Sequence, residues 1–398
     1  MRKGRNGMRI AFVYRNFSRA GSLERDSVFL VEGLARRGVE MHCYCDPNTR
    51  HVNLPGVAFH DVEAAVRSRS RFGYPLERGT FAARATRALR RDRDRYDLIH
   101  VFGVSAWEHD VVSVPAVMAA DQRRWPKEGG VGYRVARARA ALAPVLRPEV
   151  AVVRTVERLQ FRRGHFARAI TVTESVRDDL VAVHGVPPEL IDVVPPPIEV
   201  ARFAGAKDGN VRTGLGLAAE TNILLFVGHQ FERKGLSDAV AALAGTSPNA
   251  HLVVVGHGDR ESYREQAKRL SVSGRLHFVG PTAEPEHFYA AADVLVLPTR
   301  HDPWGTPVIE AMAAGIPVVT TTAAGSAGVA EKAGAAVLVP PRSPMALAAA
   351  LRDLLGDPSR RRELGERGRA AAGPFDVEAH VDSMLETYAR ALAARGRA

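Results

Sequence analysis

Short apolar runs alternate with amphipathic helical patterns along the whole chain, and most runs end in a polar or glycine-containing turn. This alternation is typical of parallel sheets that are covered by helices on both faces. In the first half, strands are expected at 9–14, 39–44, 98–102, 114–119, 170–173 and 191–194. In the second half, they are expected at 223–227, 252–255, 276–279, 294–297, 318–321 and 336–339. The pattern predicts an α/β protein with two doubly wound, Rossmann-like parallel sheets.

Two breaks in the pattern divide the chain. Three consecutive prolines, Pro195 to Pro197, precede a polar segment that reaches about residue 216 and cannot continue a helix or a central strand. We therefore expect an N-terminal domain at 1–200 and a C-terminal domain at 201–372. A second break at 373–375 is followed by one more amphipathic helix, and we expect 373–398 to pack back on the N-terminal domain.

Composition agrees with a two-domain enzyme. The 398 residues exceed the size at which single cores usually stop growing, and no run approaches the ~18 apolar residues of a membrane span. The N-terminus lacks the features of a secretory signal, so a cytoplasmic location is expected. The net charge of +11 favours anionic partners. Nucleic acid is not expected, because the basic stretches contain few aromatic residues.

The most informative segment runs from 301 to 319. Two acids, Asp302 and Glu310, are separated by seven residues, and a helix is expected between Thr306 as N-cap and Gly315 just past its end, with Pro307 as its first residue. The start of a helix offers free N–H groups and a positive dipole end, which suit phosphate or sugar hydroxyls.

A second segment, 224–235, leads from a strand through Gly228 to Arg233 and Lys234 at the head of the next helix. Two cations at such a position can donate charge-assisted hydrogen bonds to phosphate oxygens. A solvated surface pair is the alternative.

These two segments resemble the retaining glycosyltransferases of family four, which have the GT-B fold, and among them the lipopolysaccharide-core glucosyltransferases and antibiotic-tailoring relatives. The resemblance implies that Asp302 contacts the donor sugar, that Glu310 binds the ribose, and that Arg233 and Lys234 grip the diphosphate. The first acid of the family is usually Glu, so Asp302 is one methylene shorter. The residues implied to bind the donor are Gly21, Gly228, Arg233, Lys234, Phe278, Val279, Gly280, Trp304, Gly305, Thr306, Pro307 and Glu310.

In the N-terminal half the resemblance is weaker. Gly21, with Arg25 and Asp26, matches a loop that approaches the donor diphosphate in the family. The alternative is that this segment is an ordinary turn without a role in binding. His109 and Asp110 match a position that contacts the donor sugar near its anomeric carbon. A capping histidine and a solvated acid are the alternative for this pair.

The resemblance implies a hexosyltransferase that moves a sugar from a nucleoside diphosphate sugar, expected to be a UDP-sugar, to a hydroxyl of a glycan, glycolipid or natural product. The expected catalytic residues are Asp302, Glu310, Arg233, Lys234, His109 and Asp110. No cofactor and no metal site is expected, since Asp92 and Asp94 lie in an alternating-charge run typical of a solvated helix face. The alternatives are a sugar-nucleotide epimerase or phosphorylase on the same fold, or a degenerate donor-binding paralogue.

A basic stretch from Gln122 to Arg168 carries twelve Arg and Lys residues with few acids between them. The pairs Arg134/Arg137 and Arg158/Arg162 are each spaced at about one helical turn. This stretch predicts peripheral contact with an anionic membrane surface at its inner face, whereas compositional bias towards arginine is the alternative.

Overall fold

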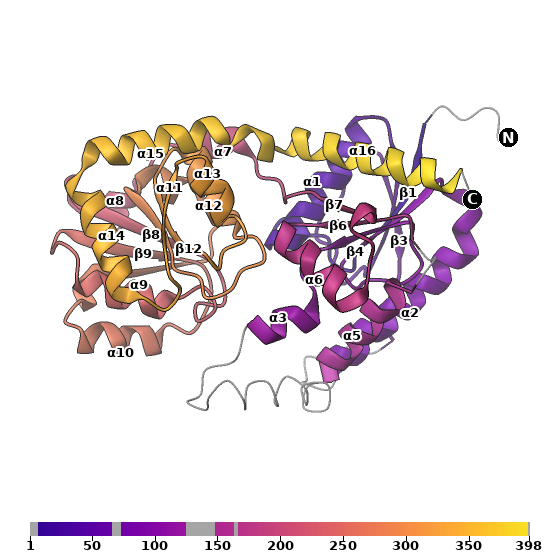
Figure 1. Cartoon of the computed structure of the whole chain (residues 1–398), viewed down its shortest axis with the longest axis horizontal. Coiled ribbons are helices and arrows are strands. Elements are labelled where there is room, and N and C mark those ends of the chain that lie inside the picture. Colours follow the sequence, from indigo (N-terminus) through magenta and orange to yellow (C-terminus); the bar gives the residue numbers. More distant parts are fainter. Residues whose placement is uncertain (1–6, 66–72, 125–147, 163–165, 397–398) are drawn as a thin grey trace. The chain divides into compact units, whose positions relative to one another are not determined.

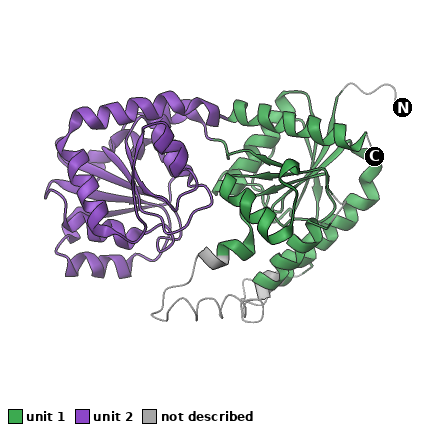
Figure 2. Cartoon of the chain, in the orientation of Figure 1, with its two compact units in different colours: residues 1–197, 377–398 green, residues 198–376 purple. Residues whose placement is uncertain are grey.

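The computed structural model describes residues 7–65, 73–124, 148–162 and 166–396. It divides into two compact units (Figure 2). Unit 1 comprises residues 1–197 and 377–398, and unit 2 comprises 198–376. The first division falls three residues before the boundary expected from the sequence. Within the described residues, no helix is both long and apolar enough to cross a membrane.

Unit 1 is built on a seven-stranded parallel sheet with the order β3-β2-β1-β4-β5-β6-β7. Its strands are β1 (Arg9–Val13), β2 (Glu40–Cys45), β3 (Val57–Asp61), β4 (Leu98–Phe102), β5 (Val111–Val114), β6 (Arg168–Thr171) and β7 (Ile191–Val193). Its helices are α1 (Ser22–Arg36), α2 (Gly73–Asp92), α3 (Met118–Arg124), α5 (Pro148–Gln160), α6 (Glu174–His184) and α16 (Val377–Arg395), with short 3₁₀ turns at Arg93–Arg95 and Pro188–Leu190.

The two faces of this sheet are covered by different helices (Figure 1). Successive side chains of a strand point to opposite faces. Ile10 and Phe12 accordingly join a core with α1 and α16, while Ala11 and Val13 join a second core with α2. Both faces of the sheet are therefore buried, which explains why its central strands are apolar almost throughout.

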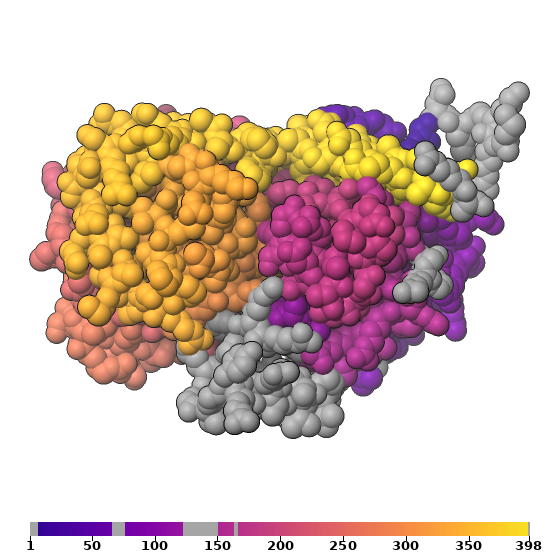
Figure 3. Space-filling model, viewed as in Figure 1, coloured from indigo at the N-terminus to yellow at the C-terminus, as the bar shows by residue number. Residues whose placement is uncertain are grey.

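The last helix, α16, belongs to unit 1. Val381, Met384 and Tyr388 are buried against α1 and the sheet. Inside this core, the buried imidazole of His100 is 2.7 Å from the Tyr388 hydroxyl and 2.8 Å from the Ser113 hydroxyl. The outer side chains of α16, yellow in Figure 3, form part of the surface.

Unit 2 contains a six-stranded parallel sheet with the order β10-β9-β8-β11-β12-β13. Its strands are β8 (Asn222–Val227), β9 (Ala250–Val255), β10 (Leu276–Gly280), β11 (Val294–Leu297), β12 (Val318–Thr321) and β13 (Ala336–Val339). Its helices are α7 (Val200–Ala204), α8 (Val211–Gly214), α9 (Leu236–Ala244), α10 (Glu261–Arg269), α11 (Glu286–Ala291), α12 (Thr306–Ala314), α13 (Ala327–Lys332), α14 (Pro344–Gly356) and α15 (Pro358–Ala371), with 3₁₀ turns at Ser273–Arg275 and Gly373–Phe375. Two doubly wound parallel sheets are thus confirmed.

Two strands of unit 1 differ from the sequence prediction. The expected strand at 114–119 is wrong, because β5 occupies Val111–Val114 and is followed by Pro115 and then by α3. Pro115 has no N–H to continue the ladder. The strand β3 was not predicted. It lies at the edge of the sheet and none of its residues is fully buried, so its hydrophobic pattern is weak.

Candidate functional site

The site in unit 2 lies at the point where the order of strands reverses. Strand β8 has β9 on one side and β11 on the other, so the chain leaves it first in one direction and later in the other. In open α/β sheets, ligands bind outside the carboxyl ends of the strands at this switch point. Gly228, Arg233 and Lys234 follow β8, and Asp302 follows β11. The topology therefore brings together the two segments that the sequence singled out.

The loops after β8 and β11 are tied to each other. The carbonyl of Arg233 accepts hydrogen bonds from the Arg300 N–H at 2.9 Å and from the Thr299 hydroxyl at 3.1 Å. Gly235 has φ 78° and caps α9, and a Cβ atom there would lie 1.9 Å from the carbonyl oxygen of Pro298. Only glycine permits this approach. The cations and the acid are thus carried on loops of fixed spacing.

Asp302 and Lys234 form a buried ion pair at this point. Their side chains are each 8% exposed, and the Lys234 ammonium donates to Oδ2 of Asp302. Nη1 of Arg233 lies 3.4 Å from Oδ1 of Asp302 and donates to the carbonyl of His301 at 2.9 Å. The aliphatic part of Lys234 packs over Gly228, where a Cβ atom would lie 3.2 Å from its Cγ. Both cations therefore converge on one carboxylate.

The charge state of Asp302 follows from these contacts. Burial alone would raise the pKa of the carboxyl group, but Lys234, Arg233 and the Trp304 N–H hold the pKa below its usual value. Asp302 is accordingly ionised at neutral pH, and the cluster carries a net positive charge.

The loop that follows Asp302 is pinned by its backbone. Gly325 donates to the carbonyl of Asp302 at 2.9 Å, and Ser326 donates to the carbonyl of Trp304 at 2.7 Å. The Trp304 side chain is buried and lies 5.8 Å from Phe375, between ring centroids. These contacts hold the backbone of the loop in place.

The prediction that Thr306 caps the following helix is wrong by one residue. The helix α12 begins at Thr306, with Gly305 as N-cap at φ 94° and Pro307 in its first turn. A positive φ suits glycine, so the backbone conformation and not a side-chain oxygen determines the start. Gly315, at φ 76°, ends the helix as expected. Gly305 has no side chain with which to cap the helix.

Glu310 lies one turn inside α12 and is 4% exposed. Its Oε2 accepts a hydrogen bond of 2.7 Å from the hydroxyl of Tyr289, a fully buried residue of α11. A carboxylate has about four positions that can accept a hydrogen bond, and the bond from Tyr289 orients Glu310 by occupying one of them. Asp302 and Glu310 are therefore both buried acids that follow β11.

Three glycine turns lie side by side at the carboxyl ends of β8, β9 and β10. Gly228 donates to Val255 at 3.0 Å, and Gly256 donates to Gly280 at 2.9 Å. Phe278, next to Val279 on β10, packs at 5.7 Å from the Arg264 guanidinium and 6.1 Å from the Phe231 ring. The backbone around Phe278 to Gly280 thus forms one margin of the same sheet edge.

In unit 1, Gly21 is the N-cap of α1 and follows β1, at the carboxyl edge of its sheet. The Glu24 carboxylate lies against it, 2.3 Å from the position a Cβ atom on Gly21 would take. Tyr14 and Asn16 donate long hydrogen bonds of 3.5 and 3.4 Å to the same carboxylate. Asp26 is buried in the first turns of α1.

His109 and Asp110, which the resemblance implied to contact the donor sugar, do not lie at the carboxyl edge of the sheet. They immediately precede β5, and since β4 and β5 are parallel, the segment between them returns to the amino edge. Asp110 accepts from the Ile99 N–H at 2.7 Å and from Arg93 at 2.8 Å. His109 is buried beside Phe166, with ring centroids 5.9 Å apart. Asp110 therefore joins strands and has a structural role.

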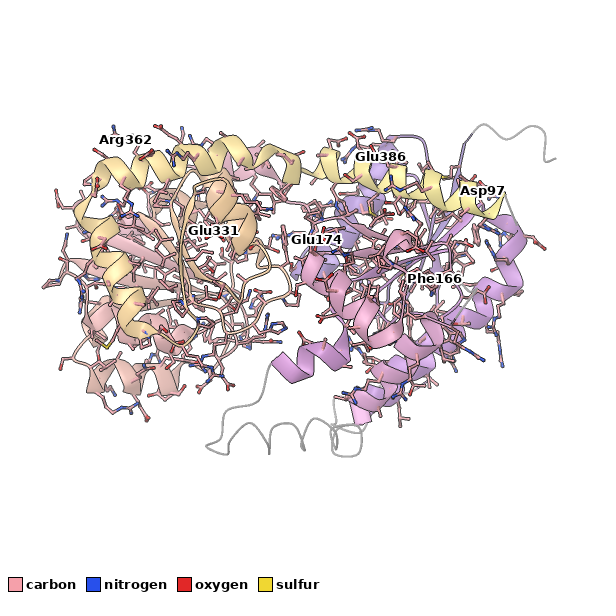
Figure 4. The ribbon with its side chains drawn as sticks, in the orientation of Figure 1. Asp97, Phe166, Glu174, Glu331, Arg362 and Glu386 are labelled. Atoms are coloured by element: carbon pink, nitrogen blue, oxygen red, sulfur yellow. The ribbon has the colours of Figure 1, made fainter. Side chains whose placement is uncertain are left out.

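Figure 4 labels Asp97, which directly precedes β4 at this amino edge. Asp97 is labelled near the end of α16, where Arg395 donates to its carbonyl at 2.7 Å and lies 3.4 Å from Asp110. Burial holds the pKa of Asp110 above its usual value, although Arg93 and Arg395 act in the opposite direction. These contacts bind the end of the chain to the sheet.

The acids of the alternating-charge run also have structural partners. Asp92 accepts a hydrogen bond of 2.9 Å from the Tyr44 hydroxyl and pairs with Arg91. Across the described ranges, no group of three or more His, Cys, Asp or Glu side chains is arranged to hold a metal ion.

Sequence reasoning missed two contributors. Tyr289 comes from α11, 21 residues before Glu310, and Ser326 binds the carbonyl of Gly305 at 3.1 Å. Neither belongs to a local motif. Only the topology, which places α11 and the loop after β12 beside α12, could have identified them.

Comparison with known proteins agrees with this geometry. Residues 209–371 match the family model of glycosyl transferases group 1, and residues 24–202 match that of glycosyltransferase family 4. A D-inositol 3-phosphate glycosyltransferase of Kineococcus radiotolerans is 29% identical over 94% of this chain and 91% of its own length. The same enzyme of Streptomyces bingchenggensis is 30% identical over 75% and 67%, respectively.

Solved structures share the fold. WaaG, a glycosyltransferase involved in lipopolysaccharide biosynthesis, has a TM-score of 0.78 at 23% identity and covers 95% of this chain and 98% of its own. An Anabaena protein in complex with UDP and glucose has a TM-score of 0.68 at 18% identity over 96% and 99%. The family matches span both units, and the chain belongs to the GT-B glycosyltransferases of family four, enzymes that use nucleotide sugars.

Proposed function

We propose that unit 2 binds the nucleoside diphosphate sugar and that unit 1 binds the acceptor. The observation that supports this proposal is the cluster of partly buried Arg233 with buried Lys234 and Asp302 at the switch point of the unit 2 sheet, followed by the buried Glu310 in α12. Two cations suit a diphosphate, and a buried carboxylate suits vicinal ribose hydroxyls. The start of α12 contributes backbone N–H groups and the positive end of a helix dipole.

The donor is a UDP-hexose in this proposal. The Anabaena protein of the same fold is found with UDP and glucose. The base would be held by the backbone of Phe278, Val279 and Gly280, and the sugar by Asp302 and the backbone from Trp304 to Pro307. Gly21 is proposed as a further residue that contacts the diphosphate.

Transfer would proceed with retention of the anomeric configuration and without a metal ion. The bond between the anomeric carbon and the diphosphate oxygen breaks, and the leaving oxygen accepts the proton of the acceptor hydroxyl. That hydroxyl oxygen forms the new bond on the same face of the sugar. Arg233 and Lys234 would stabilise the negative charge that develops on the diphosphate, so neither a metal ion nor a protein nucleophile is required.

A screen of nucleotide sugars tests the function. The purified protein is heated with UDP-, GDP- and ADP-hexoses, because a ligand that binds only the native state raises the melting temperature. Donors that stabilise the protein are then incubated with candidate acceptors, and both the free nucleoside diphosphate and the anomer of the product are identified. Transfer with inversion would contradict the mechanism. Conversion of the sugar without transfer would indicate an epimerase, dependence on free phosphate a phosphorylase, and donor binding without turnover a degenerate paralogue.

The acceptor is proposed to be a hydroxyl of a glycan, glycolipid or natural product. The relatives named above are D-inositol 3-phosphate glycosyltransferases, which act on a small phosphorylated acceptor. A phosphorylated acceptor also agrees with the net charge of +11.

Contact with an anionic membrane surface is a further part of this proposal. Of the basic stretch from Gln122 to Arg168, residues 125–147 and 163–165 lie outside the described residues. Arg158 and Arg162 are exposed near the end of α5, whereas Arg168 pairs with Asp192 at 3.1 Å and is not available. Sedimentation with anionic vesicles at low and moderate salt tests the contact, with the Arg158→Gln/Arg162→Gln variant for comparison. Absence of binding at low salt would contradict it.

A further inference from the structure

The Asp302 carboxylate is bound by the two cations that are proposed to bind the donor diphosphate. Both of its oxygens face cations, Oδ2 towards Lys234 and Oδ1 towards Arg233. An aspartate reaches one methylene less far than a glutamate, and the backbone of Asp302 is held by Ala323 and Gly325. The short side chain therefore ends on the same two cations that would take the phosphate oxygens.

A diphosphate and Asp302 compete for these cations. Lys234 and Asp302 are buried, so a diphosphate that takes over Lys234 deprives Asp302 of its principal partner. A buried charge without a partner is strongly unfavourable. Binding of a diphosphate alone is consequently opposed by the cost of displacing Asp302.

A sugar removes this cost. Its hydroxyl groups can donate hydrogen bonds to the displaced carboxylate, and hydrogen bonds to a charged group are the stronger kind. The intact donor supplies such hydroxyls beside the diphosphate, whereas the nucleoside diphosphate that remains after transfer has lost the sugar that carried them. Asp302 would then return to Lys234 and oppose retention of the product.

We propose that Asp302 is a displaceable internal anion, which lowers the affinity of the site for free diphosphates relative to the sugar-bearing donor and so promotes release of the nucleoside diphosphate product. This inference rests on the proposed function, because it requires Arg233 and Lys234 to bind the diphosphate. It differs from simple sugar recognition in one respect: removing the charge of Asp302 should strengthen the binding of a ligand that has no sugar.

Isothermal titration calorimetry of the full chain with inorganic pyrophosphate and with UDP tests this difference. The Asp302→Asn variant keeps the shape of the side chain and removes its charge. We expect it to bind both ligands at least about tenfold more tightly than the wild type, since a charge-assisted bond no longer has to be broken. If this variant does not fold, Asp302→Ser is used instead, because it replaces the carboxylate with a smaller, uncharged side chain.

Two control variants make the result specific. Asp238→Asn removes another buried acid of unit 2, whose partner is Arg300 at 3.4 Å, and should leave pyrophosphate affinity unchanged. Lys234→Ala should weaken pyrophosphate binding. The inference is overturned, and the proposed function kept, if Lys234→Ala weakens binding but neither charge-removing variant strengthens it. If neither the wild type nor the variants bind pyrophosphate or UDP, the inference and the proposed function are both overturned.

Discussion

Glu310 provides the most direct test at the scale of single residues. If its carboxylate binds ribose hydroxyls, Glu310→Ala should weaken nucleotide binding by about 1.5 to 3 kcal/mol, the usual range for hydrogen bonds to a charged group. Tyr289→Phe removes only the hydroxyl that orients Glu310 and should cause a smaller loss. Calorimetric titration with the nucleotide measures both. Unchanged affinity in a folded Glu310→Ala protein would contradict the assignment.

Arg233 and Lys234 should act mainly on the departing diphosphate. An interaction that strengthens in the transition state affects kcat more than donor affinity. We expect Arg233→Ala and Lys234→Ala each to lower kcat by at least about tenfold, with a smaller change in donor affinity. Steady-state kinetics combined with equilibrium binding separates the two effects. A change confined to KM would mean that the cations contribute only to ground-state binding.

The aspartate at position 302 should suit the native donor better than glutamate. The longer side chain of Asp302→Glu would have to fit among Lys234, Arg233 and the pinned loop, all of which are closely packed. We expect lower turnover with the native donor, measured as product formed at saturating substrate. A higher rate would show that the shorter acid is not an adaptation of this site.

At the scale of elements, α16 and its neighbours should make unit 1 sensitive to acid. Burial lowers the pKa of His380 to about 4 and that of His100 to about 3. Such groups are neutral in the fold, so their stabilisation is complete above the unfolded pKa of about 6.5 and is lost as pH falls below it. As the pH falls from 6.5 to 5, each of these two histidines should lower the free energy of unfolding by about 2 kcal/mol.

Denaturant unfolding at pH 7 and pH 5 measures this loss. The Nδ1 of His380 is 2.9 Å from the Pro195 carbonyl, and a glutamine at this position could still donate a hydrogen bond without titrating. His380→Gln should therefore lose less stability between the two pH values than the wild type. Equal losses of stability in the variant and the wild type would show that His380 does not cause the acid sensitivity.

The same scale shows what sequence could and could not predict. The four central strands of unit 2 are almost wholly buried and have distinct apolar runs. Its edge strands β10 and β13 are mostly only partly buried but remain largely apolar, and all six strands were predicted at their observed positions to within a few residues. The strand β3 was missed because only its first three residues are apolar, so it has no such run. Asp110 was misplaced because it follows the strand at 98–102 and its glycine loop in the sequence, whereas the short return to the amino edge depends on the pairing of β4 with β5.

At the scale of the whole chain, the two units are assembled differently. Unit 2 is continuous in sequence, whereas unit 1 takes its last helix from residues beyond 376. The proline and glycine break at 373–375 indicated that the last helix is separate. Its contacts with α1 join positions more than 300 residues apart, and no local pattern encodes such a distance.

This arrangement predicts that unit 1 depends on the end of the chain. Removal of residues 377–398 would expose the core that Val381, Met384, Tyr388 and Ala391 cover, all of which are at most 1% exposed. At about 1.5 to 3 kcal/mol for each large apolar side chain, the loss is comparable with the 5 to 15 kcal/mol by which whole domains are stable. The shortened chain should therefore keep a folded unit 2 and lose a folded unit 1.

Hydrogen exchange, read separately for the two units, distinguishes these outcomes. In the chain shortened to residue 376, amides of β1, β4 and α1 should exchange nearly as fast as in an unfolded chain, while those of β8 and β11 stay protected. Tyr388→Phe in the full chain is the matched mild change, because it removes only the hydroxyl beside His100. It should leave unit 1 folded and cost about 1 to 3 kcal/mol. Protected β1 and β4 amides in the shortened chain would show that unit 1 folds without α16, and that the helix only covers a core already stable by itself.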